Sequence, residues 1–449
     1  MRPRLARWIY TLGWSLVLPL VPLYLLWRSV RQPEYRHHWR ERFFGLGAAL
    51  GAGERDVYWL HAVSLGETRA ALPLIEALAA AHPHARFLLT HMTPTGRAAG
   101  AEIAQRLPGR IVQRYLPYDV PSALRRFFRQ ARPRIGIVLE TEIWPNLLAE
   151  ARAAGVPMVL VNARLSERSL RKAQRWPALI GPAAACFARV AAQTAADRDR
   201  IAQVYGGPID VLGNLKFDLA PAADQVERGR ALRARFGARP VWLFASSRDG
   251  EEALVLDALK KMGSDPIFFA IFLIVPRHPQ RFDEVARLIE ARGWRCRRRS
   301  GSEWERAPEG DAVLLGDSMG EMALYCAAAD VALIGGSLLP FGSQNLIEAC
   351  AVGTPVVIGP STFNFAQAAE DAIAADAAVQ VKDVTEAVAV MGALTSDQPR
   401  LEAMRRAARA FAAAHRGATA RTVALVEEVL CAPAVRGDAA RSGSPAHVS

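Results

Sequence analysis

Cysteine is scarce in this chain, and its few cysteines are not spaced as metal ligands or as paired half-cystines. No two of them form a CxxC pair, and their number is odd. A disulfide framework and a zinc site both need closely or regularly spaced cysteines, so the sequence argues against either. We therefore expect a reducing, cytoplasm-facing compartment. The cysteines are Cys186, Cys296, Cys326, Cys350 and Cys431.

Acidic residues are outnumbered as well, because 44 Asp and Glu stand against 56 Lys and Arg, for a formal net charge of +12. Such an excess attracts phosphates, anionic lipid surfaces or nucleic acid, and charge alone does not choose among them. Glycine and proline are not enriched enough to indicate disorder. At 449 residues the chain exceeds what one hydrophobic core usually supports, so we expect two large domains.

Formal charge is also missing from one long run near the N-terminus. The twenty residues from Trp8 to Trp27 carry none, and Arg7 and Arg28 flank them. That length matches a hydrocarbon core of about 30 Å, and the aromatic residues at both ends suit the headgroup region. A cleaved signal peptide is disfavoured, because RSVRQPEYRHHWR follows where a small-residue cleavage site should be. We expect residues 1–30 to be a membrane anchor.

The form of this anchor stays open. Its length favours a spanning helix, whereas Pro19 and Pro22 can bend the run into a helix that lies in the interface. A buried core helix is the third interpretation. The positive-inside bias places the rest of the chain on the cytoplasmic side, although arginines also precede the run. The arginines after the run are Arg28, Arg31, Arg36, Arg40 and Arg42, and those before it are Arg2, Arg4 and Arg7.

Short apolar runs bounded by turn residues recur along the rest of the chain and alternate with helical stretches. Such alternation predicts parallel sheets with crossover helices. The pattern loosens at residues 206–224, which separates two series of runs. The sequence thus predicts an α/β fold of two Rossmann-like doubly wound domains, 31–218 and 219–432, and a disordered tail, 433–449. The expected strands are VYWLHAV (57–63), RFLLTH (86–91), RIGIVLE (134–140), PMVLVNA (157–163), PVWLFASS (240–247), IFFAIFLIVPRH (267–278), AVLLGD (312–317), DVALIGGS (330–337) and TPVVIGP (354–360).

Ligands of open α/β sheets bind at the carboxyl ends of strands, so two such domains imply a ligand cleft. Within 330–360, a predicted strand runs into Gly336, a loop continues to Gly342, and a helix carries Asn345 and Glu348. Small residues let backbone N–H groups approach a phosphate, and a carboxylate in that helix can accept hydrogen bonds from ribose hydroxyls. The combination favours nucleotide binding over an ordinary strand–turn–helix joint.

This stretch resembles the donor-binding signature of the lipid A Kdo (3-deoxy-D-manno-octulosonic acid) transferases, and further motifs that cover most of the chain identify it as a member of that family. The resemblance implies GT-B architecture, with an N-terminal anchor at the inner membrane. It also implies inverting transfer of Kdo from CMP-Kdo to a hydroxyl of the lipid A precursor, lipid IVA, without a metal or other cofactor. The matching motifs are HAVSLGE (61–67), YLPYD (115–119), ETEIWPNLL (140–148), NARLSERS (162–169), GNLKFD (213–218), VPRHPQRF (275–282) and GDSMGEM (316–322).

Glu67 follows the first predicted strand, near the start of the next helix. A carboxylate there can take the proton from an acceptor hydroxyl as the hydroxyl attacks an anomeric carbon, if its pKa suits the working pH. The resemblance implies that Glu67 is the general base, and the alternative is a first-turn cap that complements the helix dipole. Other candidates sit at strand ends or turns on the expected acceptor side. They are Thr95, Glu140, Trp144 and Asn146.

Arg277 emerges at the carboxyl end of a predicted strand, where a guanidinium can hold the phosphate of CMP. The resemblance supports this role, and Asp317 is the one acid near the donor loop that could matter. Many relatives have a His–Gly–Gly–His–Asn-like loop where this chain has residues 341–345, and Ser343 lacks the backbone freedom of glycine. The remaining donor candidates are His278, Lys216, Arg248, Ser318, Met319, Gly320, Gly336, Ser337, Asn345 and Glu348.

Two other classes of function are weighed against this one. The first is another tandem α/β nucleotide-sugar enzyme, such as a sugar-nucleotide epimerase or a different glycosyltransferase. The second is a membrane-tethered binder of nucleic acid or another anionic polymer. The chain lacks aromatic-interleaved basic stretches and recognised nucleic-acid motifs, so we expect no nucleic-acid partner. The expected partners are a nucleotide-sugar donor, a lipid A precursor and the inner membrane.

Overall fold

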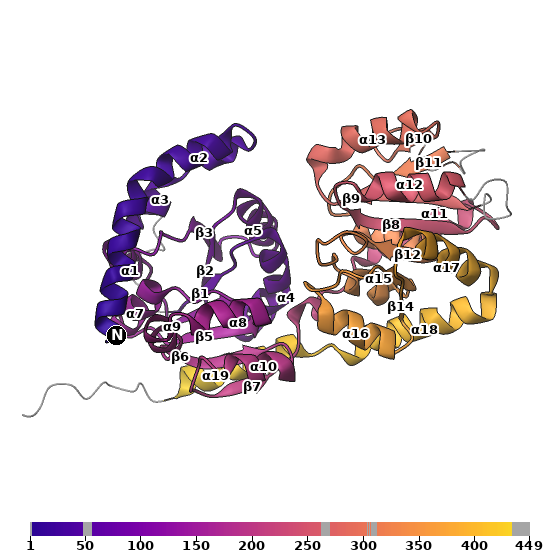
Figure 1. The fold of residues 1–449 in the computed structure, drawn as a ribbon. Helices are drawn as coiled ribbons and strands as arrows, with labels where there is room; N and C mark the ends of the chain where they lie inside the picture. Colours follow the sequence, from indigo (N-terminus) through magenta and orange to yellow (C-terminus); the bar gives the residue numbers. More distant parts are fainter. Residues whose placement is uncertain are drawn as a thin grey trace, which may run out of the picture. The chain divides into compact units, whose positions relative to one another are not determined.

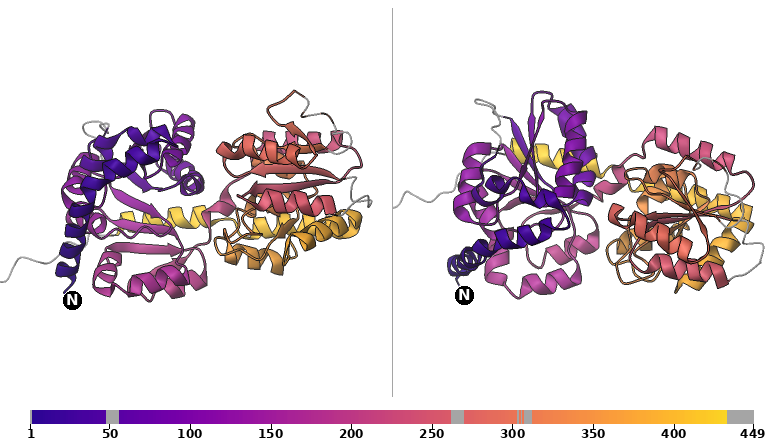
Figure 2. Two further views of the ribbon diagram at one scale, coloured as in Figure 1. Left: turned by 45° about the horizontal axis from the view of Figure 1, so that its top comes forward. Right: turned by 90° about the horizontal axis from the view of Figure 1, so that it is seen from above.

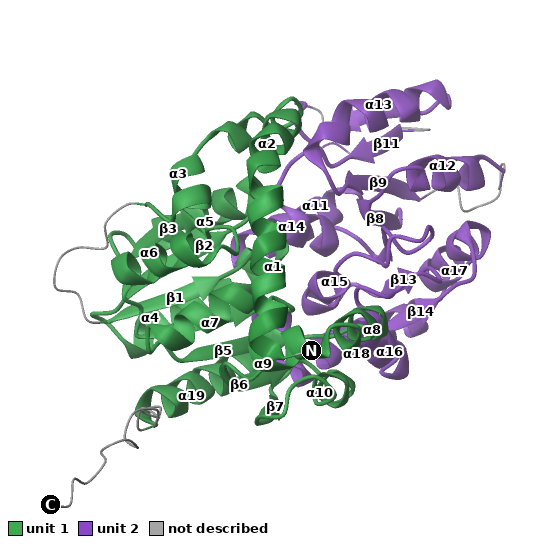
Figure 3. Ribbon diagram, turned by 60° about the vertical axis from the view of Figure 1, so that its left-hand side comes forward, with its two compact units in different colours: residues 1–215, 418–449 green, residues 216–417 purple. Residues whose placement is uncertain are grey.

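The computed structural model describes residues 2–47, 56–261, 270–302, 304, 306 and 312–432. The chain forms two compact units (Figure 3), of which unit 1 comprises residues 1–215 and 418–449 and unit 2 comprises residues 216–417. Each is an α/β domain built on a seven-stranded parallel sheet (Figure 1), which confirms the predicted fold class. The expected tail, 433–449, and the first residues of the expected strand 267–278 lie outside the described residues.

The sheet of unit 1 has the strand order β3-β2-β1-β4-β5-β6-β7. The order reverses between β1 and β4, and such a switch point is where open α/β sheets bind ligands, at the carboxyl ends of the strands. Alternate residues of each strand face opposite helix layers, with α6, α7 and α9 on one face and α4, α5 and α19 on the other. The strands are β1 (Val57–His61), β2 (Arg86–His91), β3 (Ile111–Tyr115), β4 (Ile135–Leu139), β5 (Met158–Ala163), β6 (Phe187–Ala192) and β7 (Ile209–Val211). The helices are α3 (Trp39–Phe44), α4 (Leu65–Ala81), α5 (Pro94–Arg106), α6 (Pro121–Ala131), α7 (Pro145–Ala153), α8 (Glu167–Gln174), α9 (Pro177–Ala184), α10 (Ala195–Ile201) and α19 (Ala418–Cys431).

The sheet of unit 2 has the order β10-β11-β9-β8-β12-β13-β14, with its switch point between β8 and β12. Helices α11, α14, α15 and α16 pack on one face, and α12, α13 and α17 on the other. The strands are β8 (Val241–Ser247), β9 (Ile271–Pro276), β10 (Arg295–Arg298), β11 (Ala312–Leu315), β12 (Val331–Ile334), β13 (Val356–Ile358) and β14 (Ala378–Gln380). The helices are η3 (Leu215–Asp218), α11 (Ala223–Arg235), α12 (Glu251–Lys261), η5 (Pro279–Arg281), α13 (Phe282–Ala291), α14 (Met322–Ala327), α15 (Ile347–Val352), α16 (Ala366–Ala374), α17 (Val384–Ser396) and α18 (Gln398–Ala414).

The units differ from the domain limits expected from the sequence. The division falls between Leu215 and Lys216 instead of at 218/219, and residues 418–432 belong to unit 1 instead of the second domain. Their helix, α19, lies against α4 and β6 because Leu425 and Val426 are buried in the apolar cluster on that face of the first sheet. The chain therefore enters unit 2 once, leaves it once, and ends in the unit where it began.

The described residues include one helix, Pro3–Ser29, that is long and apolar enough to cross a membrane. It consists of α1 (Pro3–Val17), η1 (Leu18–Leu20) and α2 (Val21–Ser29), and leads through η2 (Pro33–Arg36) to α3. In both views of Figure 2 this indigo helix runs along unit 1, and it contacts α7 and α9. Its inner side buries Ala6, Val21 and Leu25.

Most of the helix remains exposed, so the interpretation as a buried core helix is wrong. Its outer side carries large apolar side chains, and Leu16 and Trp27 are 69% and 68% exposed. Single exposed apolar residues are ordinary, but a continuous row of this length indicates a surface that contacts a membrane or another protein. The exposed apolar residues of the helix are Leu5, Trp8, Ile9, Leu12, Leu16, Val17, Leu20, Leu23, Tyr24, Leu26 and Trp27.

Candidate active site

Glu67 lies in the first turn of α4, directly after β1 at the switch point of unit 1. Ser64 caps this helix, and its hydroxyl donates to Oε1 of Glu67 at 2.8 Å. The backbone N–H of Val63 donates to Oε2 at 2.7 Å. Together these contacts resemble a capping box, in which a helix-cap serine and a glutamate three residues later bond reciprocally. The alternative predicted from the sequence, a first-turn cap, is thus present in the structure.

The same carboxylate has the protonation behaviour of a base. Burial is the main cause that raises the pKa of Glu67 to about 7, and the negative charges of Glu140 and Glu142 add to it against the bonds from Val63 and Ser64. A carboxylate with a pKa near the working pH is partly ionised and still basic enough to take a proton in a transition state. Capping and general-base catalysis are therefore compatible roles for Glu67.

Glu140 directly follows β4, the neighbour of β1 across the switch point. Its backbone is left-handed, with φ of 62°, which is uncommon for any residue other than glycine and marks a locally constrained position. Its carboxylate lies 3.6 Å from Nε of Arg164, which follows β5. Glu140, whose negative charge adds to the rise in the pKa of Glu67, therefore lies in a constrained turn.

Trp144 lies four residues after Glu140 and contacts two residues that were not predicted as site residues, Glu142 and His61. Its Nε1 donates to Oε2 of Glu142 at 2.5 Å, and its ring meets that of His61 edge to face at 5.8 Å between centroids. His61 is fully buried at the end of β1, and burial lowers its pKa to about 3, so it is neutral. Both residues stand inside predicted motifs, which was the only signal for them.

The two other predicted acceptor-side residues lie differently. Asn146 is buried, and its backbone N–H and Nδ2 donate to Asp119 at 3.1 and 2.8 Å. Its amide group is therefore used within the fold and is not open to an acceptor. Thr95 is exposed in the first turn of α5, where its hydroxyl contacts that of Thr93 at 3.4 Å.

The glycine loop of unit 2 follows β12 and folds back on itself. The N–H groups of Ser343 and Gln344 donate to the carbonyls of Gly336 and Gly335 at 2.6 and 2.9 Å. A side chain on Gly335 would meet the carbonyl oxygen of Ser246 at 2.3 Å, so no other residue fits there. Ser343 has a φ of 68°, so the departure from glycine predicted to restrict this loop falls at a left-handed position.

Glu251, which the sequence analysis did not single out, holds this loop in place. Its fully buried carboxylate accepts backbone N–H groups of Gly336 at 2.7 Å, Leu338 at 3.0 Å and Leu339 at 3.3 Å. It also accepts the N–H of Arg248 at 2.9 Å. One side chain thereby joins the end of β8 to the loop after β12, across the switch point of unit 2.

Positive charge gathers beside this loop. Nε of Arg277, which follows β9, donates to Oε1 of Gln344 at 3.0 Å, and the guanidinium of Arg248 lies 4.7 Å from the ring centre of Phe341. The pKa of His278 is lowered by burial first and then by the charges of Arg277, Arg248 and Arg281, which places all three near one imidazole. Such a corner attracts phosphate and carboxylate groups.

Arg281, the third of these arginines, pairs with a buried carboxylate. Its guanidinium donates to both oxygens of the buried Glu252 at 2.6 and 3.2 Å. The hydroxyl of Ser247 donates to the same carboxylate at 2.7 Å. Arg281 and Glu252 therefore fasten the turn after β9 to α12.

The residues predicted to contact the ribose and the Kdo carboxylate lie in or near α15 and at η3. Nδ2 of Asn345, just before α15, donates to Oε1 of Glu348 in its first turn at 3.1 Å, so the two side chains lie together. Nζ of Lys216 lies 5.3 Å from the ring centre of Phe365, at the start of α16. Ser337, in contrast, is buried and accepts the N–H of Gly359 at 2.8 Å, which joins the ends of β12 and β13.

In the turn after β11, the side chains of Asp317 and Ser318 form a separate set of hydrogen bonds. The Ser318 hydroxyl contacts Glu321 and Tyr325 at 2.5 Å each, and Asp317 accepts from Nε of Arg298 at 2.7 Å. The pKa of Asp317 is lowered despite its burial, because Ser300 and Arg298 bond to it. The next two residues, Met319 and Gly320, are exposed at the tip of the turn.

Among the residues that the structure describes, no group of three or more His, Cys, Asp or Glu side chains is arranged to hold a metal ion. That the reaction needs no metal stays a prediction.

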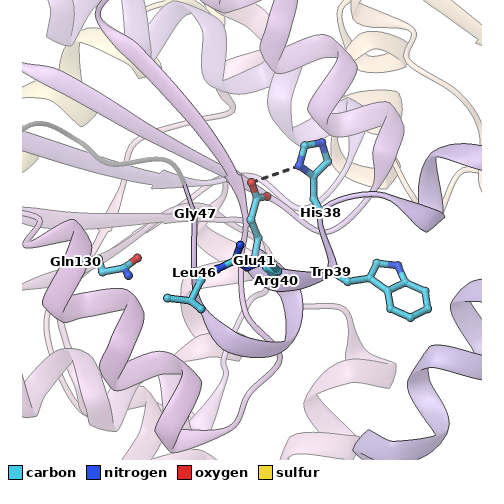
Figure 4. A pocket seen from close by; sticks show the side chains of 7 residues that line it. All are labelled: His38, Trp39, Arg40, Glu41, Leu46, Gly47 and Gln130. Carbon is cyan, nitrogen blue, oxygen red and sulfur yellow. Dashed lines mark ion pairs between the residues drawn. The ribbon is translucent and has the colours of Figure 1, made fainter.

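A cavity of about 550 Å³ opens in unit 1 beside α3 (Figure 4). Glu41 turns toward His38 there at 3.5 Å, and its carboxylate also accepts from Arg97 at 2.6 Å and from the N–H of Tyr115 at 2.8 Å. None of the predicted site residues lines this cavity. The lining residues are His38, Trp39, Arg40, Glu41, Leu46, Gly47 and Gln130.

Comparison with known proteins gives a consistent assignment. Residues 37–219 match the family model described as 3-deoxy-D-manno-octulosonic-acid transferase (kdotransferase). The chain is 45% identical over 432 residues to the 3-deoxy-D-manno-octulosonic acid transferase of Bordetella pertussis, covering 95% of this chain and all of that protein. The enzyme of the same name from Haemophilus influenzae is 32% identical, over 88% of this chain and 92% of its own.

Solved structures show the same fold at much lower identity. A glycosyltransferase from Rickettsia africae superimposes with a TM-score of 0.58 at 11% identity, covering 84% of this chain and 99% of that one. The two tandem Rossmann-like domains are therefore the GT-B architecture.

The first prediction concerns the pKa of Glu67. Glu140→Gln removes a neighbouring negative charge, so the pKa of Glu67 should fall. A general base acts when deprotonated, so if Glu67 is the base, the rise of kcat/KM for sugar transfer expected near pH 7 in wild type should move to lower pH. The pH profile measures this, with Glu102→Gln on the exposed side of α5 as the matched control. An unchanged profile, or a shift to higher pH, would mean that Glu140 does not act on the base.

Proposed function

Because the chain belongs to the family of 3-deoxy-D-manno-octulosonic acid transferases, we propose that it transfers Kdo from CMP-Kdo to a hydroxyl of the lipid A precursor lipid IVA, in lipopolysaccharide core biosynthesis. The observation that carries the proposal is the carboxylate of Glu67, buried at a switch point with a pKa of about 7. A buried carboxylate tuned to neutral pH is what deprotonation of a sugar hydroxyl requires.

The proposed reaction is a direct displacement with inversion. Glu67 takes the proton of the acceptor hydroxyl while the hydroxyl oxygen forms a bond to the anomeric carbon of Kdo. The bond from that carbon to the phosphate oxygen breaks, and CMP leaves with its electron pair. Arg277 and Arg248 stabilise the charge that develops on the leaving phosphate. No metal takes part in this proposal.

The donor is held by unit 2 in this scheme. Glu251 fixes the loop on which Gln344 lies, and Arg277, bonded to Gln344, is assigned a charge-assisted contact with the phosphate. Glu348, presented with Asn345, accepts hydrogen bonds from the ribose hydroxyls. Lys216 near the start of α16 is assigned to the carboxylate of Kdo, a second negative group on the donor.

The helix Pro3–Ser29 is proposed to lie in the membrane interface at the cytoplasmic face of the inner membrane, as a monotopic anchor. A spanning helix would have to leave the domain, whereas this helix is packed along unit 1 on one side and exposes a row of apolar residues on the other. A helix with an apolar outer side, flanked by basic residues, binds anionic bilayers in this orientation. The lipid acceptor resides in the same interface.

The second prediction tests the general base. Glu67→Gln keeps the size of the side chain and removes its basicity, so kcat for Kdo transfer to lipid IVA should fall by about two to four decades. The dissociation constant of CMP-Kdo should change little, because the donor is bound by unit 2. Mass spectrometry of the lipid product measures transfer, and Glu102→Gln is again the control. A variant that kept its turnover and lost thermal stability would show that Glu67 is only a helix cap.

The third prediction tests the donor corner. Arg277→Ala removes a charge-assisted bond whose loss typically costs about 1.5–3 kcal/mol, so CMP should bind roughly ten- to a hundredfold more weakly. Calorimetric titration with CMP measures the affinity, and Glu348→Ala should weaken it as well. Arg230→Ala, on the exposed side of α11, should leave it unchanged. If both site variants bound CMP normally, the nucleotide would have to lie elsewhere.

The fourth prediction tests the anchor. Leu16→Glu with Leu23→Glu places charges on the exposed side of the helix, so binding to vesicles that contain anionic lipid should weaken at least tenfold. Leu254→Glu, at an exposed leucine of unit 2, is the control. Alkaline carbonate should release the wild-type protein from membranes. Retention under carbonate would show a spanning helix and overturn the monotopic arrangement.

A further inference from the structure

The anchor helix does more than attach the enzyme to a membrane. We propose that Tyr10 and Thr11 of this helix are positioning residues for catalysis, because they fix the start of α7. The inference rests on the proposed function and extends it. It connects a polar stripe on the inner side of the helix to the segment 140–146, which lies beside the proposed base.

Asp119 is the centre of this connection. It is 1% exposed, and its Oδ1 and Oδ2 accept the N–H groups of Leu147 at 2.7 Å and Asn146 at 3.1 Å. Its backbone carbonyl accepts Nδ2 of Asn146 at 2.8 Å. The N-cap residue of α7, Trp144, forms no side-chain cap of its own. Asp119 therefore satisfies the first turn of a helix that begins more than twenty residues later in the sequence.

The anchor helix completes the coordination of this carboxylate. The hydroxyl of Tyr10 donates to Asp119, and Nε1 of Trp14 donates to the Tyr10 oxygen at 2.8 Å, which directs the hydroxyl proton toward the carboxylate. The hydroxyl of Thr11 is shared between the carbonyl of Arg7 at 2.8 Å and Oδ1 of Asn146 at 3.1 Å. Two consecutive residues of α1 thus bond to both members of the Asp119–Asn146 pair.

Removing the bonds from Tyr10 and Thr11 costs free energy, because Asp119 and Asn146 are buried. The pKa of Asp119 is raised to about 6 by burial, while the bonds from Asn146, Tyr10 and Leu147 lower it. A buried carboxylate that loses a donor either takes up a proton or draws in water, and either change loosens its remaining bonds. The N–H groups that begin α7 are those remaining bonds.

The start of α7 is close in sequence to the groups that surround the base. Trp144 is two residues before Asn146, and it contacts both Glu142 and His61. Glu140 and Glu142 act electrostatically on Glu67. This segment belongs to unit 1, whereas the donor is assigned to unit 2. A shift of the segment would move the groups around the base, and displacements of about 1 Å at an active site can cost a hundredfold in rate. Donor affinity should therefore be insensitive to Tyr10 and Thr11.

The experiment compares Tyr10→Phe/Thr11→Val with wild type in the full chain bound to vesicles. We expect kcat for Kdo transfer to fall about tenfold while KM for CMP-Kdo and vesicle binding stay unchanged and the protein remains folded at the assay temperature, with a modestly lower Tm. Amide hydrogen exchange at Asn146 and Leu147 should become faster. Tyr24→Phe, a tyrosine on the exposed side of the same helix, is the matched control and should behave as wild type. Thr11→Ser, which keeps the hydroxyl, should retain the wild-type kcat.

Two results would overturn the proposal. One is an unchanged kcat and unchanged exchange in the double variant. The other is a loss of kcat that follows the fraction of unfolded protein at the assay temperature or a loss of vesicle binding, since that would show a merely structural contact. If the double variant does not fold, Thr11→Val alone decides by the same measurements. The exchange readout needs no substrate, so a wild-type protein without Kdo transfer would refute the proposed function and leave the positioning role to be judged by exchange.

Discussion

A carboxylate that leaves water must be given hydrogen-bond donors, and its pKa rises where they are too few. Each unit has a buried glutamate at the same position, the first turn of the helix that follows the first strand in the sequence. Glu67 receives two donors and keeps neighbouring negative charge, so it stays titratable near pH 7. Glu251 receives four backbone N–H groups and is used to fix a loop. Burial raises the pKa of both carboxylates, and they differ in their surroundings: Glu251 is held by backbone N–H groups of two segments, whereas Glu67 lies near the negative charges of Glu140 and Glu142.

The sequence predicted the centre of each sheet and missed its edges. The nine expected runs correspond to β1, β2, β4 and β5 of unit 1 and to β8, β9, β11, β12 and β13 of unit 2. The strands that were not expected lie at or next to an edge, and β10 reads RCRR. A strand covered by helices on both faces must be apolar throughout, whereas an edge strand is partly wet and admits charge. Hydrophobic runs therefore report burial more than strand structure itself.

The candidate site divides in a similar way. Local motifs pointed to Glu67, Arg277 and the glycine loop as candidates, because those residues lie close to their own strand ends. They could not show which way Asn146 and Ser337 face, since both bond to partners that are distant in sequence. Asp119 and Glu251 escaped notice for the same reason: their importance comes from the N–H groups of another segment. The sequence shows which groups a side chain carries, but not which distant residue it bonds to in the fold.

The return of α19 to unit 1 has a consequence for how the protein folds during its synthesis on the ribosome. Unit 2 is one uninterrupted stretch of chain, so it can complete its sheet as soon as it emerges. Unit 1 is made first yet lacks the helix that covers Leu215 and its neighbours until the last residues are translated. Throughout synthesis the older half waits unfinished, with an apolar helix already exposed at its N-terminus. The sheet of unit 2 can therefore form before the fold of unit 1 is complete.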